Sequence, residues 1–91
     1  MLLVVAYDVP DDRRRARLHT LLLGYGRPVQ LSVFECEVTA EEARALKRRV
    51  AHAIRPRQDN VRYYPLCAAC AAKIEDGSGA RRPPEPDVYV V

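Results

Sequence analysis

The stretch that decides the fold is 2–12, which reads Leu-Leu-Val-Val-Ala-Tyr-Asp-Val-Pro-Asp-Asp. Its first six residues are apolar and are followed by turn-forming residues, a pattern that predicts a strand buried on both faces. Pro10 cannot continue a central strand, and Asp11 or Asp12 can cap a helix that follows. Asp8 therefore lies at the carboxyl end of a central strand, where sheets of this kind commonly bind ligands.

The residues that follow alternate between helical and strand patterns. Apolar spacing predicts a helix over 13–25, with glycines at its end. Residues 28–38 alternate like a strand except at Val33-Phe34, so they form either one long bent strand with a bulge or two short strands. Thr39 and Glu42 make a capping box that begins a second helix, which ends at Pro56. Further strand and helix signals follow at 60–65, closed by Pro65, and at 67–73.

This order of elements predicts an α+β fold, a ferredoxin-like βαββαβ sandwich with both helices on one face of a single sheet. We expect one domain over 1–75 and a linker rich in Gly, Pro and charge over 76–87. Residues 88–91 have the pattern of an extra C-terminal strand. That strand must pair with an edge, either in its own chain or in a partner.

Composition narrows the classes of protein. With 91 residues, the chain is one small domain of marginal stability on its own, so a partner subunit is expected. Three cysteines exclude a complete set of disulfides, and the short apolar start predicts neither a signal peptide nor a membrane span. We therefore expect a cytoplasmic protein that has reduced thiols and no membrane partner.

Three carboxylates, Asp8, Asp11 and Asp12, fall within five residues and could recruit Mg²⁺. Asp11 and Asp12 are more simply explained as groups that stabilise the start of the helix. One aspartate is too few to hold a catalytic metal, but a two-fold dimer would bring two copies of Asp8 together if the strand ends face the axis.

Basic residues crowd the start of the first helix, at Arg13, Arg14, Arg15 and Arg17. Cations oppose the helix dipole there, so either a bound phosphate backbone or the neighbouring aspartates must favour them. The net charge is +3, and Arg outnumbers Lys by 13 to 2, which suits phosphate contacts but also fits codon bias. Aromatic residues are few, so we expect binding to the RNA or DNA backbone rather than base stacking.

Cys67 and Cys70 form a lone CxxC pair. A structural zinc site would need a second pair, and a redox site would need another order of elements, so unreactive thiols are the simplest interpretation. His19 lies one turn after Arg15 and could reach a phosphate, although a solvated histidine is the simpler interpretation.

Residues 4–15, 29–35 and 61–66, which include the strings YDVPDDRRR and QLSVFE, resemble the CRISPR-associated endoribonuclease family of antiviral defence, the smaller of two near-universal spacer-acquisition proteins. The resemblance implies a ferredoxin-like homodimer in which Asp8 binds a divalent metal, Mg²⁺ or Mn²⁺, at the interface. The arginines after Asp12 match the family's basic helix start. Ser32 and Phe34 match positions near the family's active-site cleft.

The resemblance also implies two functional classes. The first is a metal-dependent endonuclease that cleaves single-stranded RNA or double-stranded DNA. The second is a catalytically silent DNA-binding scaffold that bridges two dimers of the CRISPR-associated integrase subunit. In the first class Asp8 is essential, and in the second it is irrelevant.

Overall fold

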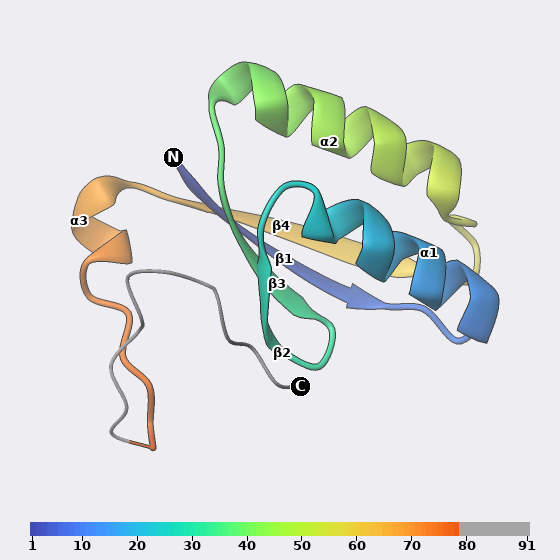
Figure 1. Ribbon diagram of the computed structural model, residues 1–91, viewed down its shortest axis with the longest axis horizontal. Coiled ribbons are helices and arrows are strands. Elements are labelled where there is room, and N and C mark those ends of the chain that lie inside the picture. The colour runs from blue at the N-terminus through green and yellow to red at the C-terminus, as the bar shows by residue number, and fades with distance from the viewer. Residues whose placement is uncertain (79–91) are drawn as a thin grey trace.

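The computed structural model describes residues 1–78 (Figure 1). Its elements are β1 (Leu2–Asp8), α1 (Asp12–Leu23), β2 (Arg27–Gln30), β3 (Val33–Glu37), α2 (Ala40–Ala53), β4 (Asn60–Leu66) and α3 (Ala68–Ala71). The expected strand over 88–91 and most of the expected linker over 76–87 lie outside the described residues. No helix within residues 1–78 is both long and apolar enough to cross a membrane.

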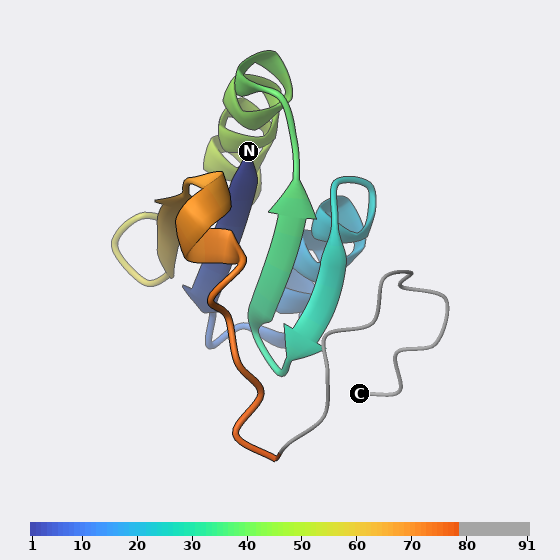
Figure 2. The same ribbon diagram turned by 90° about the vertical axis from the view of Figure 1, so that its left-hand side faces the viewer.

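The four strands form one sheet in the order β2-β3-β1-β4, and every neighbouring pair is antiparallel. β1 is central, pairing through Val5 with Phe34 of β3 and through Asp8 with Asn60 of β4. Helices α1 and α2 lie together behind the sheet in Figure 2. The α+β, ferredoxin-like architecture is therefore confirmed.

The core fills the space between the sheet and the two helices. β1 and β3 contribute alternate side chains, which meet the apolar stripes of α1 and α2. The largest fully buried residues are Leu3, Val5, Leu18, Leu22, Phe34, Cys36, Leu46 and Val50. Burial on this side of the sheet is what sets the register of β1.

The other side of the sheet has neither α1 nor α2 over it. Its central strip, which we call the open face, consists of Val4 and Ala6 from β1, Val33 and Glu35 from β3, and Arg62 and Tyr64 from β4. Val4 and Ala6 are only partly buried, and Tyr64 is 46% exposed. The prediction that β1 is buried on both faces is thus only half correct for a single chain.

Both helices begin where the sequence predicts. Asp11 caps α1 by accepting a hydrogen bond from the backbone N–H of Arg14 at 2.9 Å. Thr39 and Glu42 form the predicted capping box of α2, with each side chain accepting the other's backbone N–H. These contacts satisfy donors that the first turn of a helix would otherwise leave unpaired.

Residues 28–38 form two strands, and the turn between them is at Leu31-Ser32, two residues before the irregularity at Val33-Phe34. The sequence pattern did not indicate this turn because Leu31 is apolar, although it is 83% exposed in the structure. A register shift between Pro28 and Gln30 adds a bulge. Pro65 lies inside β4 instead of closing it, which an edge strand tolerates.

Candidate functional site

A hollow of about 640 Å³ opens at the carboxyl end of β1. It brings together residues from β1, from α1 and from the turn between β2 and β3. Asp8, Arg15 and Ser32, three of the residues singled out from the sequence, all line it. The full lining is Tyr7, Asp8, Val9, Pro10, Asp12, Arg15, Ala16, His19, Gln30, Leu31 and Ser32.

Ser32 is held against β1 by its backbone. Its carbonyl oxygen accepts a hydrogen bond from the N–H of Tyr7 at 3.0 Å. Its φ of 75° is in the left-handed region, which a residue with a side chain rarely adopts without support from its surroundings. The turn therefore holds the backbone of Ser32 beside the end of β1.

Arg15 wraps around the loop between β1 and α1. Its Nη1 donates to the carbonyl oxygen of Val9 at 2.9 Å, and its Nη2 pairs with the carboxylate of Asp12. The side chain keeps 42% of its surface exposed. Arg15 can thus still contact a bound anion, and the carboxylate of Asp12 is already in an ion pair with it.

Arg14 is committed to the fold. Its Nε and Nη2 donate to the two oxygens of Asp59 at 2.8 and 3.0 Å, and its side chain is only 13% exposed. The carboxylate of Asp59 also accepts the backbone N–H of Arg55. Hydrogen bonds from Arg14 hold the pKa of Asp59 below its usual value. The prediction that Arg14 contacts nucleic acid therefore has no support from its position.

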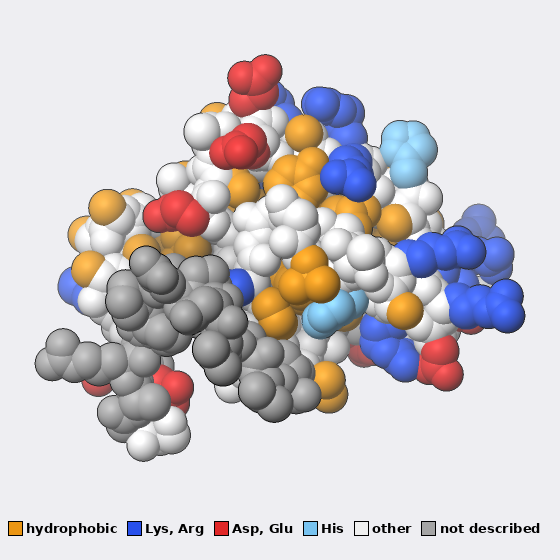
Figure 3. Space-filling model, viewed as in Figure 1, with side chains coloured by type: hydrophobic (Ala, Val, Ile, Leu, Met, Phe, Trp, Pro, Cys, Tyr) orange, Lys and Arg blue, Asp and Glu red, His pale blue; other side chains and the backbone are white. Residues whose placement is uncertain are grey.

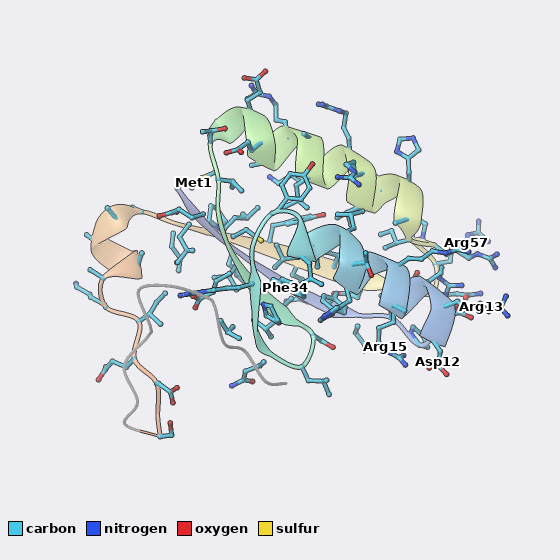
Figure 4. All side chains as sticks on the ribbon, in the orientation of Figure 1. Met1, Asp12, Arg13, Arg15, Phe34 and Arg57 are labelled. Carbon is cyan, nitrogen blue, oxygen red and sulfur yellow. The ribbon has the colours of Figure 1, made fainter. Side chains whose placement is uncertain are left out.

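Arg13 and Arg17 are exposed, and neither forms an ion pair within residues 1–78. Figure 4 shows that Arg13 and Arg57 extend outward at the end of the molecule that holds Arg15 and Asp12. Lys and Arg side chains gather at this end in Figure 3. Arg57 was missed from the sequence because nothing local links the loop before β4 to the start of α1.

Phe34 does not line the hollow. It has no exposed surface, and it lies in the core below the site. Its ring packs edge-to-face against His19 at 5.1 Å and lies 6.3 Å from the ring of Tyr7. Phe34 was predicted to lie near the active-site cleft, and it instead packs beneath the residues that line the hollow. His19 and Tyr7 are the lining residues of this cluster, and the spacing of one turn from Arg15 was the only sequence signal for His19.

The residues present suit a divalent cation only in part. No group of three or more His, Cys, Asp or Glu side chains that could hold a metal occurs within residues 1–78. Asp11 caps α1, and Asp12 pairs with Arg15, so Asp8 is the carboxylate of this loop left without a partner among the described residues. Mg²⁺ uses one or two carboxylates together with water and phosphate oxygens, so Asp8 fits as one ligand of two.

The CxxC pair lies at the opposite end of the sheet. The Sγ of Cys67 caps α3 and accepts the backbone N–H of Cys70 at 3.5 Å, and both residues are exposed. Cys36, in contrast, is buried in the core. The pair is thus remote from Asp8.

Comparisons with known proteins give matches over most of the chain. The family model of CRISPR associated protein Cas2 matches residues 1–74. A CRISPR-associated endoribonuclease Cas2 of Synechocystis is 40% identical over 74 residues, which is 81% of this chain and 80% of that protein.

Two solved structures carry the likeness into three dimensions. Streptococcus pyogenes Cas2 superposes with a TM-score of 0.76 and 33% identity, covering 84% of this chain and 98% of that one. A chain of a partial Cas6-RT-Cas1–Cas2 complex also gives a TM-score of 0.76, with 30% identity, 99% of this chain and 98% of that one. From the family match over most of its length, the chain belongs to the CRISPR-associated protein Cas2 family.

Proposed function

We propose that this chain is a divalent-metal-dependent endonuclease of a CRISPR system, acting on phosphodiester bonds of single-stranded RNA or double-stranded DNA. The observation that carries the proposal is Asp8, which lines the hollow and whose carboxylate has no partner among the described residues. The name of the Synechocystis relative, an endoribonuclease, supports the same class of reaction.

The side chains of the hollow divide into two roles. Asp8 would hold the Mg²⁺ or Mn²⁺ ion, which when bound supplies a more acidic water and neutralises charge on the phosphate. Arg15 and Ser32 would bind the oxygens of that phosphate, since both offer donors in the same hollow. The ion pair between Arg15 and Asp12 holds the guanidinium in place before substrate arrives.

We infer that the active form is a homodimer formed across the open face. Asp8 continues the row of β1 residues that includes Val4 and Ala6, because side chains two apart point to the same side of a strand. A two-fold axis near the end of this row would bring together the Asp8 carboxylates of both copies. The metal would then have the second carboxylate that one chain does not offer.

The open face also makes the dimer testable. We expect sedimentation to give about twice 10.3 kDa for the wild type and the monomer mass for Val4→Lys. Leu31→Lys, at an exposed turn position outside the open face, is the matched control and should remain dimeric. A Val4→Lys protein that folds by circular dichroism and still dimerises would move the interface elsewhere.

A second candidate is a DNA-binding scaffold with no turnover, joined to the CRISPR-associated integrase subunit. Exposed Arg13 and Arg57 lie at one end of the molecule, and exposed Arg17 follows Arg13 by one turn of α1. They favour this candidate, because such a surface binds a phosphate backbone without chemistry. The partial Cas6-RT-Cas1–Cas2 complex supports Cas1 as the partner.

Cleavage of labelled single-stranded RNA and duplex DNA with Mg²⁺ or Mn²⁺ decides between the two candidates. Asp8→Asn and the control Glu41→Gln, on the exposed first turn of α2, should be purified in the same way as the wild type. We expect activity to be lost only in Asp8→Asn. Equal activity in all three proteins would identify a contaminant, and binding without cleavage in the wild type would favour the scaffold.

A further inference from the structure

His19 lines the hollow with Asp8, Arg15 and Ser32, yet the proposed chemistry gives it no role. It lies on α1 one turn after Arg15, so both side chains are on the same side of the helix. His19 is partly exposed, whereas the two aromatic residues that pack against it, Tyr7 and Phe34, are buried. Of this cluster, the imidazole is thus the side chain most accessible to a ligand in the hollow.

Two neighbours fix the imidazole ring. The ring of Phe34 meets it edge-to-face, at 5.1 Å and an interplanar angle of 70°. The hydroxyl oxygen of Tyr7 lies 3.4 Å from its Nδ1. That hydroxyl has no other hydrogen-bond partner within residues 1–78, so donation to Nδ1 is the one contact there that satisfies its proton.

This contact favours one tautomer of the neutral imidazole. A tyrosine phenol is a hydrogen-bond donor at neutral pH, and Nδ1 is the acceptor that it meets here. A neutral imidazole that accepts at Nδ1 carries its hydrogen on Nε2, and a protonated imidazole carries one there as well. Nε2 is therefore a donor in either state, and it makes no hydrogen bond to any residue from 1 to 78.

The charges that face His19 are compatible with an anion. Arg15 is the cation in the same hollow, and Ser32 adds a neutral donor. Of the two carboxylates there, Asp12 is paired with Arg15. Asp8 is the carboxylate that would repel a bound anion, unless a cation lies between them or the anion binds away from it. Three donors from α1 and the β2–β3 turn thus line one space.

We propose that the Nε2–H group of His19 donates a hydrogen bond to a phosphate oxygen of the nucleic-acid strand bound in this hollow. The inference rests on the proposed function only in taking nucleic acid as the ligand. It makes His19 a phosphate-binding residue that works with Arg15 and Ser32, and it assigns to Tyr7 and Phe34 the task of orienting the ring.

Two near-isosteric substitutions test the donor itself. The amide nitrogen of Gln can take the place of Nε2, whereas the shorter side chain of Asn places its amide near Nδ1. We expect His19→Asn to weaken binding of a short single-stranded RNA, measured in EDTA by fluorescence anisotropy, by about tenfold, because a hydrogen bond to a charged group is lost. His19→Gln should bind close to the wild type.

His52, an exposed histidine on α2 whose Nδ1 contacts the carbonyl oxygen of Arg48, provides the control. His52→Asn and His52→Gln should both bind like the wild type. Equal affinities for the two His19 variants, whether both unchanged or both weakened, would overturn the proposal, because the position of the donor would then not matter. Absence of both RNA and duplex DNA binding by the wild type would also overturn it.

The EDTA experiment separates this inference from the nuclease proposal. A wild type that fails to cleave with Mg²⁺ or Mn²⁺, but that binds RNA more tightly than His19→Asn does, would remove the nuclease and retain the His19 contact. Cleavage that depends on Asp8, together with equal binding by both His19 variants, would do the reverse.

Discussion

Arg14 and Asp59 form a two-pronged ion pair, in which Nε lies 2.8 Å from Oδ2 and Nη2 lies 3.0 Å from Oδ1. The pair joins the first turn of α1 to the loop before β4, and the Asp59 side chain has no exposed surface. Since a third donor, the N–H of Arg55, also reaches Asp59, this carboxylate organises one end of the molecule.

Loss of the Asp59 charge should lower stability. Asp59→Asn leaves a shielded guanidinium without its counter-charge, so we expect the melting temperature to fall by at least about 5 °C. Asp12→Asn breaks a pair whose carboxylate is 90% exposed and should have little effect. Equal melting temperatures for the two variants would contradict the structural role of Asp59.

The same pair predicts how stability changes in acid. Hydrogen bonds from Arg14 lower the pKa of Asp59 from its ordinary 3.8. A lowered folded pKa stabilises the protein fully above the ordinary value, and the benefit is lost as pH falls through the lower folded value. The free energy of unfolding, measured with urea, should therefore fall more steeply below pH 4 for the wild type than for Asp59→Asn.

Gly26 should not tolerate a side chain. A Cβ there would collide with the carbonyl oxygen of Glu35 and lie 2.6 Å from the Sγ of Cys36. We expect Gly26→Ala to cost about 1–3 kcal/mol in chemical denaturation, because strand β3 must move. At Gly24 the nearest atom is 3.3 Å away and the backbone is helical, so Gly24→Ala should change stability by less than about 1 kcal/mol. The reverse order would disprove this packing.

Exposed arginines should set the salt dependence of nucleic-acid binding. We expect Arg13→Ala combined with Arg17→Ala to weaken binding to duplex DNA and to reduce the slope of log K against log salt by about 2. Titrations at several salt concentrations measure it. Arg14→Ala should act mainly through the melting temperature, since its guanidinium is held by Asp59. A slope unchanged by the double substitution would exclude phosphate contacts at these two residues.

The three thiols should differ in reactivity. The backbone N–H of Cys70 lowers the pKa of Cys67, whereas the hydrogen bond with Cys67 raises that of Cys70. Burial raises the pKa of Cys36 to about 11. Iodoacetamide at neutral pH should therefore modify Cys67 first, Cys70 later, and Cys36 only after unfolding, as peptide mass spectrometry can show. Early modification of Cys36 would contradict its burial.

Features that depend on neighbouring residues could be predicted from the sequence. The capping box of Thr39 and Glu42 and the Asp11 cap lie within one helical turn, so their residue types alone indicate the helix starts. The β2–β3 turn was not predicted because Leu31 is apolar yet exposed, and because Ser32 adopts a φ that usually favours glycine.

The site was predicted only as far as its local residues reach. Asp8 directly follows the apolar run of β1 and is its last residue, so its place at the strand end could be inferred. The partner of Arg14 could not be predicted, since Asp59 lies 45 residues later in the chain, in the loop before β4. The edge-to-face contact that buries Phe34 under His19 likewise depends on tertiary packing.

The central position of β1 has a consequence for how the chain is made. Strand β1 has no complete set of neighbours until β4 has been synthesised, because Asp8 pairs with Asn60 and Leu2 with Leu66. Such distant pairing delays folding, since a long loop must close before it is rewarded. A nascent chain that ends before β4 would therefore lack both the edge beside Asp8 and the anchor of Arg14. The residues that line the hollow all lie between 7 and 32, so they are synthesised well before the strand that supports β1 beside them.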